Sequence, residues 1–177
     1  MMPSPPPVLA DAELCARARR IALVLTDSDG VLTDAGVYYS ERGEELKRFS
    51  IRDGMGVERL RNAGIATAIV TGEKSGSVVK RAEKLGIRAY LGVKDKAALL
   101  PAILAEHGVE IGQVAYIGDD VNDVPAMRAI RESGLIGAPA DALTMVLAEV
   151  HHRTEEPGGH GAFRGFAEWI LALREEP

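Results

Sequence analysis

Two short clusters of carboxylates are the residues of this sequence best suited to chemistry. The first contains Asp27 and Asp29, and the second, between Gly118 and Asp123, contains Asp119, Asp120 and Asp123. Several carboxylates held together are costly unless a cation neutralises them, and a hard divalent ion with oxygen ligands suits such a site. Each cluster alone is equally typical of a polar turn or of an acidic loop that caps a helix.

Two further segments could hold an anion. Thr71-Gly72 offers a hydroxyl group and main-chain amides to phosphate oxygens. Asp95 is a plausible helix cap, which would place Lys96 in the first turn of a helix, where the helix dipole disfavours a cation. Taken singly, the first segment is an ordinary turn between a strand and a helix, and the lysine is an ordinary surface residue.

The elements that must position these groups alternate along the chain. Short apolar runs predict buried strands at 21–25, 66–70, 88–91 and 113–117, with a weaker one at 134–137. Helical spacing covers 11–20, where Asp11 is a plausible N-cap, and then 54–63, 75–85, 95–107 and 122–131. This alternation predicts an α/β fold with a doubly wound parallel sheet covered on both faces. The acidic clusters and Thr71-Gly72 follow predicted strands, and ligands bind at the carboxyl ends of strands in such sheets.

Two segments depart from this alternation. Residues 36–50 read as a β-hairpin around Glu41-Arg42-Gly43-Glu44. Residues 155–177 contain a glycine-rich tail followed by an amphipathic helix. We expect a disordered, proline-rich leader at 1–10 and one domain over 11–177.

Composition excludes several classes of function. The chain has 177 residues, a formal net charge of -5 and no block of Lys and Arg, so we expect no nucleic-acid partner. No apolar run is long enough for a membrane span, and no secretory signal precedes the fold, which makes the cytoplasm the expected location. The single cysteine, Cys15, cannot form an internal disulfide.

Taken together and in this order, the four segments resemble the four motifs of the haloacid dehalogenase superfamily. The resemblance runs from about Ile21 to Trp169. It is closest to the small-cap branch that includes 3-deoxy-manno-octulosonate 8-phosphate (KDO 8-phosphate) phosphatases and sialic-acid 9-phosphate phosphatases. The hairpin, the run Arg52 to Val57 and the run Gly159 to Arg164 support that branch.

The resemblance implies a Mg²⁺-dependent phosphatase. Asp27 would attack phosphorus, and Asp29 would act as general acid and then as general base. The magnesium ligands would be the Asp27 carboxylate, the Asp29 main-chain carbonyl and the Asp119 carboxylate, with Asp120 and Asp123 in support. Thr71, Gly72 and Lys96 would hold the phosphoryl oxygens.

The implied substrate is a phosphorylated 2-keto-3-deoxy sugar acid with eight or nine carbons. Glu73 is similar to the sialic-acid relatives, whereas the octulosonate enzymes more often have arginine there. Arg81 and Lys84 share a helix face that would suit a substrate carboxylate, although a solvated surface explains them nearly as well. The branch also implies a homotetramer, in which Arg164 is our candidate for reaching a neighbour's site; an ordinary surface loop explains that residue equally well.

Three other classes of protein compete with this interpretation. A non-catalytic assembly module associated with sialic-acid activation would be expected to lose the catalytic set, which is present here. A receiver domain would not explain Asp29 or the hairpin. A dinucleotide-binding domain would need a Gly-x-Gly-x-x-Gly run after the first strand, where the sequence has none.

Overall fold

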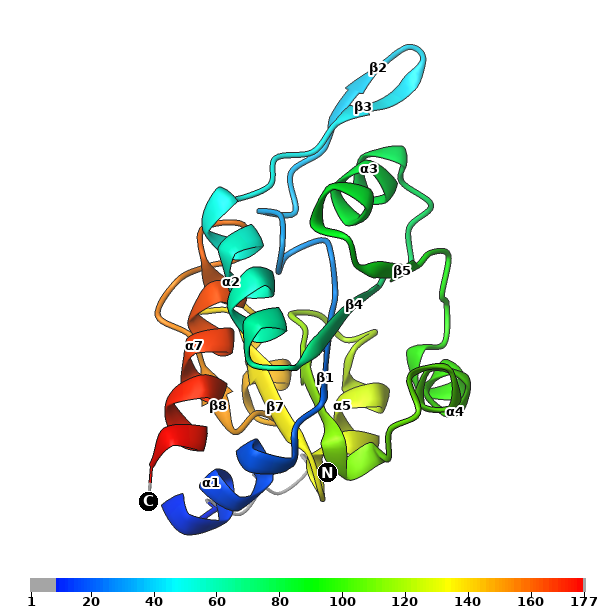
Figure 1. Cartoon of the computed structure of the whole chain (residues 1–177). Helices are drawn as coiled ribbons and strands as arrows, with labels where there is room; N and C mark the ends of the chain where they lie inside the picture. Colours follow the sequence, from blue (N-terminus) through cyan, green and yellow to red (C-terminus); the bar gives the residue numbers. More distant parts are fainter. Residues whose placement is uncertain (1–8, 177) are drawn as a thin grey trace.

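The computed structural model describes residues 9–176, so residues 1–8 of the predicted leader lie outside the described residues. A parallel sheet runs through the centre of the molecule in the order β5-β4-β1-β6-β7-β8 (Figure 1). Its strands are β1 (Leu23–Thr26), β4 (Ala66–Val70), β5 (Arg88–Tyr90), β6 (Val114–Ile117), β7 (Leu135–Ala138) and β8 (His152–Arg153). The predicted doubly wound α/β fold is confirmed.

Strand β1 lies at the point where the chain changes direction across the sheet. All four of its residues are buried, as expected for three apolar residues followed by Thr26. Leu23 pairs with Ala66 of β4 on one side and with Val114 of β6 on the other. The chain fills the β4 and β5 side first and then crosses to β6. In such sheets the crevice at this switch point, beyond the carboxyl ends of the strands, is where ligands bind.

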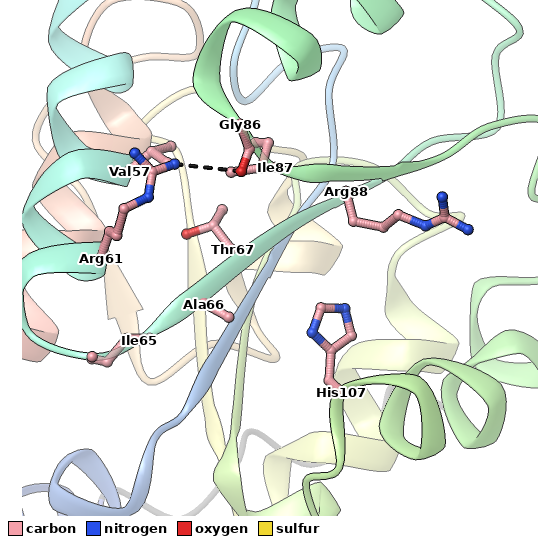
Figure 2. Close-up of a pocket in the computed structure, with 10 residues that line it drawn as sticks. Val57, Arg61, Ile65, Ala66, Thr67, Gly86, Ile87, Arg88 and His107 are labelled. Carbon is pink, nitrogen blue, oxygen red and sulfur yellow. Dashed lines mark hydrogen bonds between the residues drawn. The ribbon is translucent and has the colours of Figure 1, made fainter.

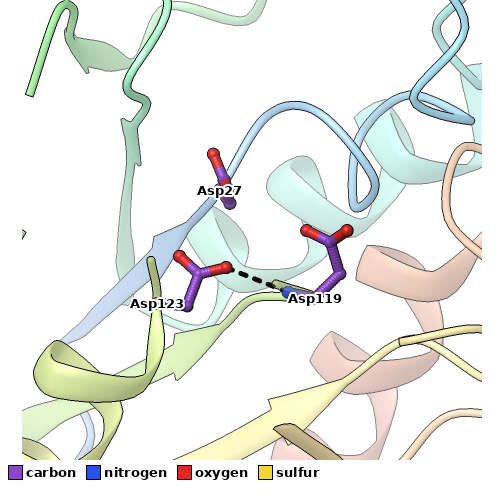
Figure 3. Close-up of side chains that lie close together, drawn as sticks. All are labelled: Asp27, Asp119 and Asp123. Carbon is purple, nitrogen blue, oxygen red and sulfur yellow. Dashed lines mark hydrogen bonds between the residues drawn. The ribbon is translucent and has the colours of Figure 1, made fainter. Parts of the chain in front are cut away.

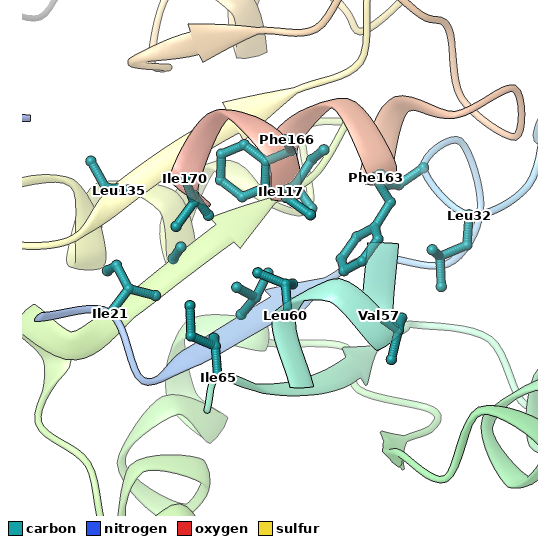
Figure 4. Packing of buried hydrophobic residues seen from close by; sticks show 14 of the residues in the cluster. Ile21, Leu32, Val57, Leu60, Ile65, Ile117, Leu135, Phe163, Phe166 and Ile170 are labelled. Atoms are coloured by element: carbon teal, nitrogen blue, oxygen red, sulfur yellow. The ribbon is translucent and has the colours of Figure 1, made fainter. Parts of the chain in front are cut away.

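Helices cover both faces of the sheet. One face carries α1 (Asp11–Arg20), α2 (Ile51–Asn62), α3 (Gly76–Leu85) and α7 (Ala162–Glu175), and the other carries α4 (Lys96–His107), α5 (Val124–Arg131) and the short α6 (Thr144–Leu147). A single 3-10 turn, Ile111–Gln113, precedes β6. Figure 4 shows Phe163, Phe166 and Ile170 of α7 packed over β1 and β6. Each such side chain contributes roughly 1.5–3 kcal/mol when fully buried, so α7 is a principal part of the core.

Two predicted helix starts are wrong by two or three residues, and one predicted N-cap is wrong. Helix α2 begins at Ile51 rather than at 54, because Ser50 caps it by accepting a hydrogen bond from the Arg52 main-chain N–H at 3.1 Å. Asp11 is the first helical residue of α1 and not its N-cap, which is Ala10. Helix α5 begins at Val124, two residues after the predicted start.

The predicted hairpin is confirmed as β2 (Tyr38–Ser40) and β3 (Gly43–Leu46). It projects away from the sheet (Figure 1), and both strands are largely exposed. Strand β8 and helix α6 were not predicted, because two and four residues are too short to produce a periodic pattern. Among residues 9–176, no helix combines the length and apolar character that crossing a bilayer requires.

Candidate active site

Three carboxylates meet at the carboxyl edge of the sheet. Asp27 directly follows β1, while Asp119 and Asp123 lie in the loop after β6. One oxygen from each lies within 4.8 Å of the others (Figure 3). The pairing of β1 with β6, with Thr26 opposite Ile117, is what brings the two sequence clusters together.

Lys96 lies between two of these carboxylates. Its Nζ is 2.7 Å from Asp27 Oδ2 and 2.6 Å from Asp123 Oδ1. The predicted cap is present, because Asp95 Oδ1 accepts a hydrogen bond from the Ala98 main-chain N–H at 2.9 Å and α4 begins at Lys96. Burial acts to lower the pKa of Lys96, but Asp27 and Asp123 outweigh it and the pKa is raised. The lysine is therefore a buried, permanent cation.

Asp123 supports the site rather than offering free ligand atoms. Its Oδ1 accepts hydrogen bonds from the Tyr116 hydroxyl and from Lys96, both at 2.6 Å. Its Oδ2 accepts from the main-chain N–H groups of Asp119 and Asp120, at 3.0 and 3.2 Å. Burial and the nearby Asp123 raise the pKa of Tyr116 well above its ordinary value, so the hydroxyl stays a donor. These contacts fix the loop that carries Asp119.

The pKa values of Asp27 and Asp119 are both raised above the ordinary value for an aspartate. Burial, followed by the charge of Asp123, raises the pKa of Asp27 to about 7. Burial and the charge of Asp27 raise the pKa of Asp119 to about 8. Asp119 Oδ1 is buried and has no hydrogen-bond partner among the described residues. A partnerless buried oxygen beside a second carboxylate fits a divalent cation with oxygen ligands.

Asp29 is paired with a residue that the sequence analysis missed. Lys47, which follows β3 of the hairpin, places Nζ 2.8 Å from Asp29 Oδ1 and 2.7 Å from Oδ2. The Lys47 side chain is 1% exposed, and its Nζ is also 3.6 Å from Glu44 Oε2. Glu44 in turn accepts a hydrogen bond from the Ser75 hydroxyl, just before α3. No sequence motif marks Lys47, since its role depends on how the hairpin returns to the sheet.

A cleft of about 200 Å³ connects these groups. It is lined by Asp27, Asp29, Ala35, Thr71, Gly72, Glu73, Asp119, Asp120 and Asn122. All of these except Ala35 and Asn122 were predicted site residues. Thr71 Oγ1 accepts a hydrogen bond from the Glu73 main-chain N–H at 3.2 Å, which orders the turn after β4. Carboxylates from two strand ends and a hydroxyl and amides from a third therefore face one space.

Four predicted substrate-binding residues are not among those that line this cleft: the buried Lys96, which contacts Asp27, and Arg81, Lys84 and Arg164. Arg81 donates a hydrogen bond to the Ser50 carbonyl at 2.7 Å, and its guanidinium lies 5.6 Å from the centre of the Phe49 ring. Lys84 is exposed. Arg164 is paired with Glu168 on its own helix at 2.6 Å. Their proposed contact with a substrate stays a prediction.

A second hollow of about 340 Å³ lies at the other end of the sheet (Figure 2). It opens where β4 and β5 begin, and Arg61, Arg88 and His107 are among its lining residues. Arg88 is already paired with Glu106 at 3.1 Å. No carboxylate is among its lining residues, so it lacks the cluster of acidic side chains that the smaller cleft contains.

Comparisons with known proteins agree with this geometry. Residues 50–131 match the family model of haloacid dehalogenase-like hydrolases. A curated relative from Yersinia pestis is 39% identical over 165 residues, which is 93% of this chain and 87% of the relative. The chain belongs to the haloacid dehalogenase-like hydrolases.

The relatives define a particular group of phosphatases within that family. The Yersinia pestis protein is 3-deoxy-D-manno-octulosonate 8-phosphate phosphatase KdsC, and a relative of the same name from Haemophilus influenzae is 39% identical over 88% of this chain. The cobalt-bound structure of the Haemophilus influenzae phosphatase has a TM-score of 0.84 at 38% identity, and covers 89% of this chain and 91% of its own. The Moraxella catarrhalis phosphatase, in complex with magnesium, phosphate and KDO, has a TM-score of 0.84 at 36% identity, with 92% of each chain covered.

Proposed function

We propose that the protein is a Mg²⁺-dependent phosphomonoesterase whose substrate is a 2-keto-3-deoxy sugar acid phosphate. Among such acids, 3-deoxy-D-manno-octulosonate 8-phosphate is the first candidate, because the curated relatives bear its name. The observation that carries the proposal is Asp27 at the end of β1, held 2.7 Å from the buried Lys96 and close to the partnerless Asp119 oxygen.

The reaction uses two carboxylates in turn. An oxygen of Asp27 attacks phosphorus, the bond from phosphorus to the sugar oxygen breaks, and Asp29 gives the departing oxygen a proton. The product is an aspartyl-phosphate. A water molecule, losing its proton to Asp29, then attacks that phosphorus and releases inorganic phosphate, which restores Asp27.

The resemblance to the haloacid dehalogenase superfamily implies Asp27, Asp119 and the Asp29 main-chain carbonyl as the metal ligands. In support, Asp119 Oδ1 has no hydrogen-bond partner among the described residues, whereas both oxygens of Asp123 already accept hydrogen bonds. Bound there, Mg²⁺ would neutralise negative charge on the carboxylates and the phosphoryl group. Lys96, Thr71 and Gly72 orient the phosphoryl oxygens, and Lys47 holds the Asp29 carboxylate in the cleft.

The test is phosphate release from KDO 8-phosphate, two nonulosonate 9-phosphates and a generic aryl phosphate, with Mg²⁺ and with a chelator. We expect kcat/KM for the preferred sugar acid to exceed that for the aryl phosphate by about 100-fold or more, because a site built for polar groups rejects ligands that lack them. The chelator should abolish turnover.

Each outcome has a distinct meaning. A preference for an eight-carbon substrate would support KDO 8-phosphate, and a preference for a nine-carbon substrate would support the Glu73 similarity to the sialic-acid enzymes. No release from any sugar acid with Mg²⁺ present would overturn the proposed function and favour an assembly module.

We further propose that the hairpin packs against hairpins of other copies in a homotetramer. Tyr38, Tyr39 and Leu46 are 67%, 73% and 64% exposed, although they are large and apolar. A two-stranded hairpin is marginally stable alone, and such a patch is typical of an interface.

Sedimentation equilibrium checks this assembly. Wild type should give a mass near four times 18.9 kDa, and the Tyr39→Glu, Leu46→Glu double variant should give a lower mass, because two charges would have to be buried. Met145→Glu is the control, since Met145 is 51% exposed on α6, outside the hairpin. A monomeric wild type, or equal effects of both substitutions, would count against the hairpin interface.

A further inference from the structure

Asp53 is a buried carboxyl group that is not among the residues lining the cleft. It lies in the first turn of α2, is 1% exposed, and accepts a hydrogen bond through Oδ1 from the Arg164 main-chain N–H at 3.0 Å. Arg164 is in the first turn of α7, whose N-cap, Gly161, has no side chain with which to cap the helix. Asp53 of α2 therefore supplies the cap that α7 lacks.

The two helices are in close contact at this cap. A Cβ atom on Gly56, one turn after Asp53, would lie 3.0 Å from the Arg164 Cα and 3.1 Å from the Phe163 ring. Burial raises the pKa of Asp53 to about 6, although the main-chain N–H groups of Arg164, Gly161 and Phe163 favour its charged form. The start of α7 thus packs against α2 through the hydrogen bond from Arg164 to Asp53, and the helices can approach closely because Gly56 has no side chain.

The tail that enters α7 packs directly on the loop after β1. The Gly159 main-chain N–H donates to the Val31 carbonyl at 2.9 Å. A Cβ atom on Gly158 would lie 2.0 Å from the Gly30 carbonyl oxygen, and one on Gly159 would lie 2.4 Å from the Asp34 nitrogen. Tail and loop are therefore in backbone contact, so a displacement of one requires a displacement of the other.

That loop in turn touches the proposed metal ligands. Gly30 follows Asp29 in sequence and has a positive φ of 85°, and a Cβ atom on it would lie 2.0 Å from Asp119 Oδ2. Contacts thus run without a gap from Asp53 through the start of α7 and the tail to the loop, and from the loop to Asp29 and Asp119.

We propose that Asp53 is a positioning residue for the reaction: by capping α7 it holds Gly158 and Gly159 against the loop after β1, and so keeps Asp29 and Asp119 in place. This inference rests on the proposed phosphatase function for its effect on kcat. The coupling between Asp53 and the loop can be measured independently of activity.

The experiment compares Asp53→Ala and Asp53→Asn by steady-state kinetics on the preferred sugar acid phosphate and by amide hydrogen exchange of residues 28–34. Asp53→Ala should lower kcat by about tenfold or more with KM changed less than about twofold, since small misplacement of catalytic groups affects the chemical step most. Asp53→Asn keeps an acceptor oxygen and should recover most of kcat. Exchange of residues 28–34 should be faster in Asp53→Ala than in wild type.

Arg174→Ala is the matched control, because it loosens the same helix at its other end. Arg174 Nη1 donates to the carbonyls of Ala18 and Ile21 at 3.1 and 3.0 Å, far from the tail. It should lower thermal stability while leaving kcat and exchange of residues 28–34 near wild type. Gly158→Ala disturbs the tail directly and should reproduce the kcat loss even if Asp53→Ala folds poorly.

Two results would overturn the inference. One is an equal loss of kcat in Asp53→Ala and Arg174→Ala at equal loss of stability, which would indicate general loosening. The other is unchanged exchange of residues 28–34 in a folded Asp53→Ala or Gly158→Ala protein. If wild type released no phosphate, the proposed function would fail while the exchange comparison still decided whether Asp53 holds the loop.

Discussion

Replacing Asp27 with asparagine is expected to lower kcat by about 10⁴-fold or more without unfolding the protein. The amide is almost isosteric with the carboxylate but is not a nucleophile. It also removes a charge from a group whose burial raises its pKa to about 7, so the folded state loses little. Phosphate release at saturating Mg²⁺ and a thermal melt measure the two quantities.

The same change at a surface carboxylate serves as the control. Glu132, whose side chain is 80% exposed, should tolerate Glu132→Gln with unchanged kcat. Mass spectrometry of acid-quenched protein adds a second readout, because wild type should carry one phosphoryl group during turnover and Asp27→Asn none. Substantial residual turnover in a folded Asp27→Asn protein would mean that another group attacks phosphorus.

Replacing Lys96 with methionine is expected to impair both catalysis and stability. Without the ammonium, two buried carboxylates lose their counter-ion, and breaking such a pair costs about 3–5 kcal/mol. The phosphoryl group also loses its fixed cation, for which we expect a fall in kcat of about 10³-fold. Denaturant unfolding with a chelator, followed by unfolding with Mg²⁺, measures the stability loss and its recovery by the metal.

The stability loss should grow with pH. Lys96 lowers the pKa of Asp27, which burial has raised to about 7, so that pKa should be higher still without the ammonium. Below about pH 7 Asp27 is largely protonated in both folded proteins, whereas above it the variant must keep Asp27 protonated or bury an unpaired carboxylate, so the difference in unfolding free energy increases. Lys94→Met is the control, since Lys94 is exposed two residues before Lys96. Equal unfolding free energies for Lys96→Met and wild type in chelator would show that the ammonium does not stabilise the carboxylates.

Much of the sheet and of the carboxylate site could be predicted from the sequence. Buried parallel strands are rich in apolar residues, so β1, β4 and β6 were visible as short apolar runs, and their carboxyl ends meet at one edge. Asp27 and Asp119 follow such runs directly, which is why local sequence was enough to bring them together.

The features that were missed depend on contacts between distant segments. Lys47 reaches Asp29 only because the chain that follows the hairpin returns beside the loop after β1, where Phe49 pairs with Thr33, and nothing in its local sequence shows that. Asp53 and Arg164 are 111 positions apart, and their contact requires α2 and α7 to be packed together. Arg81 could be predicted to lie on a helix face, but its partner, the Ser50 carbonyl, is a main-chain group without a sequence signal.

The contact between the tail and the loop after β1 also bears on when this protein becomes active during its synthesis. Val31 is translated well before Gly159, which donates a hydrogen bond to its carbonyl. A nascent chain therefore contains Asp27, Lys96 and Asp119 before it contains Gly158 and Gly159, which pack against the loop after β1. Because the tail is translated after all three of these residues, we expect the cleft of a nascent chain to be completed only once the tail has been synthesised.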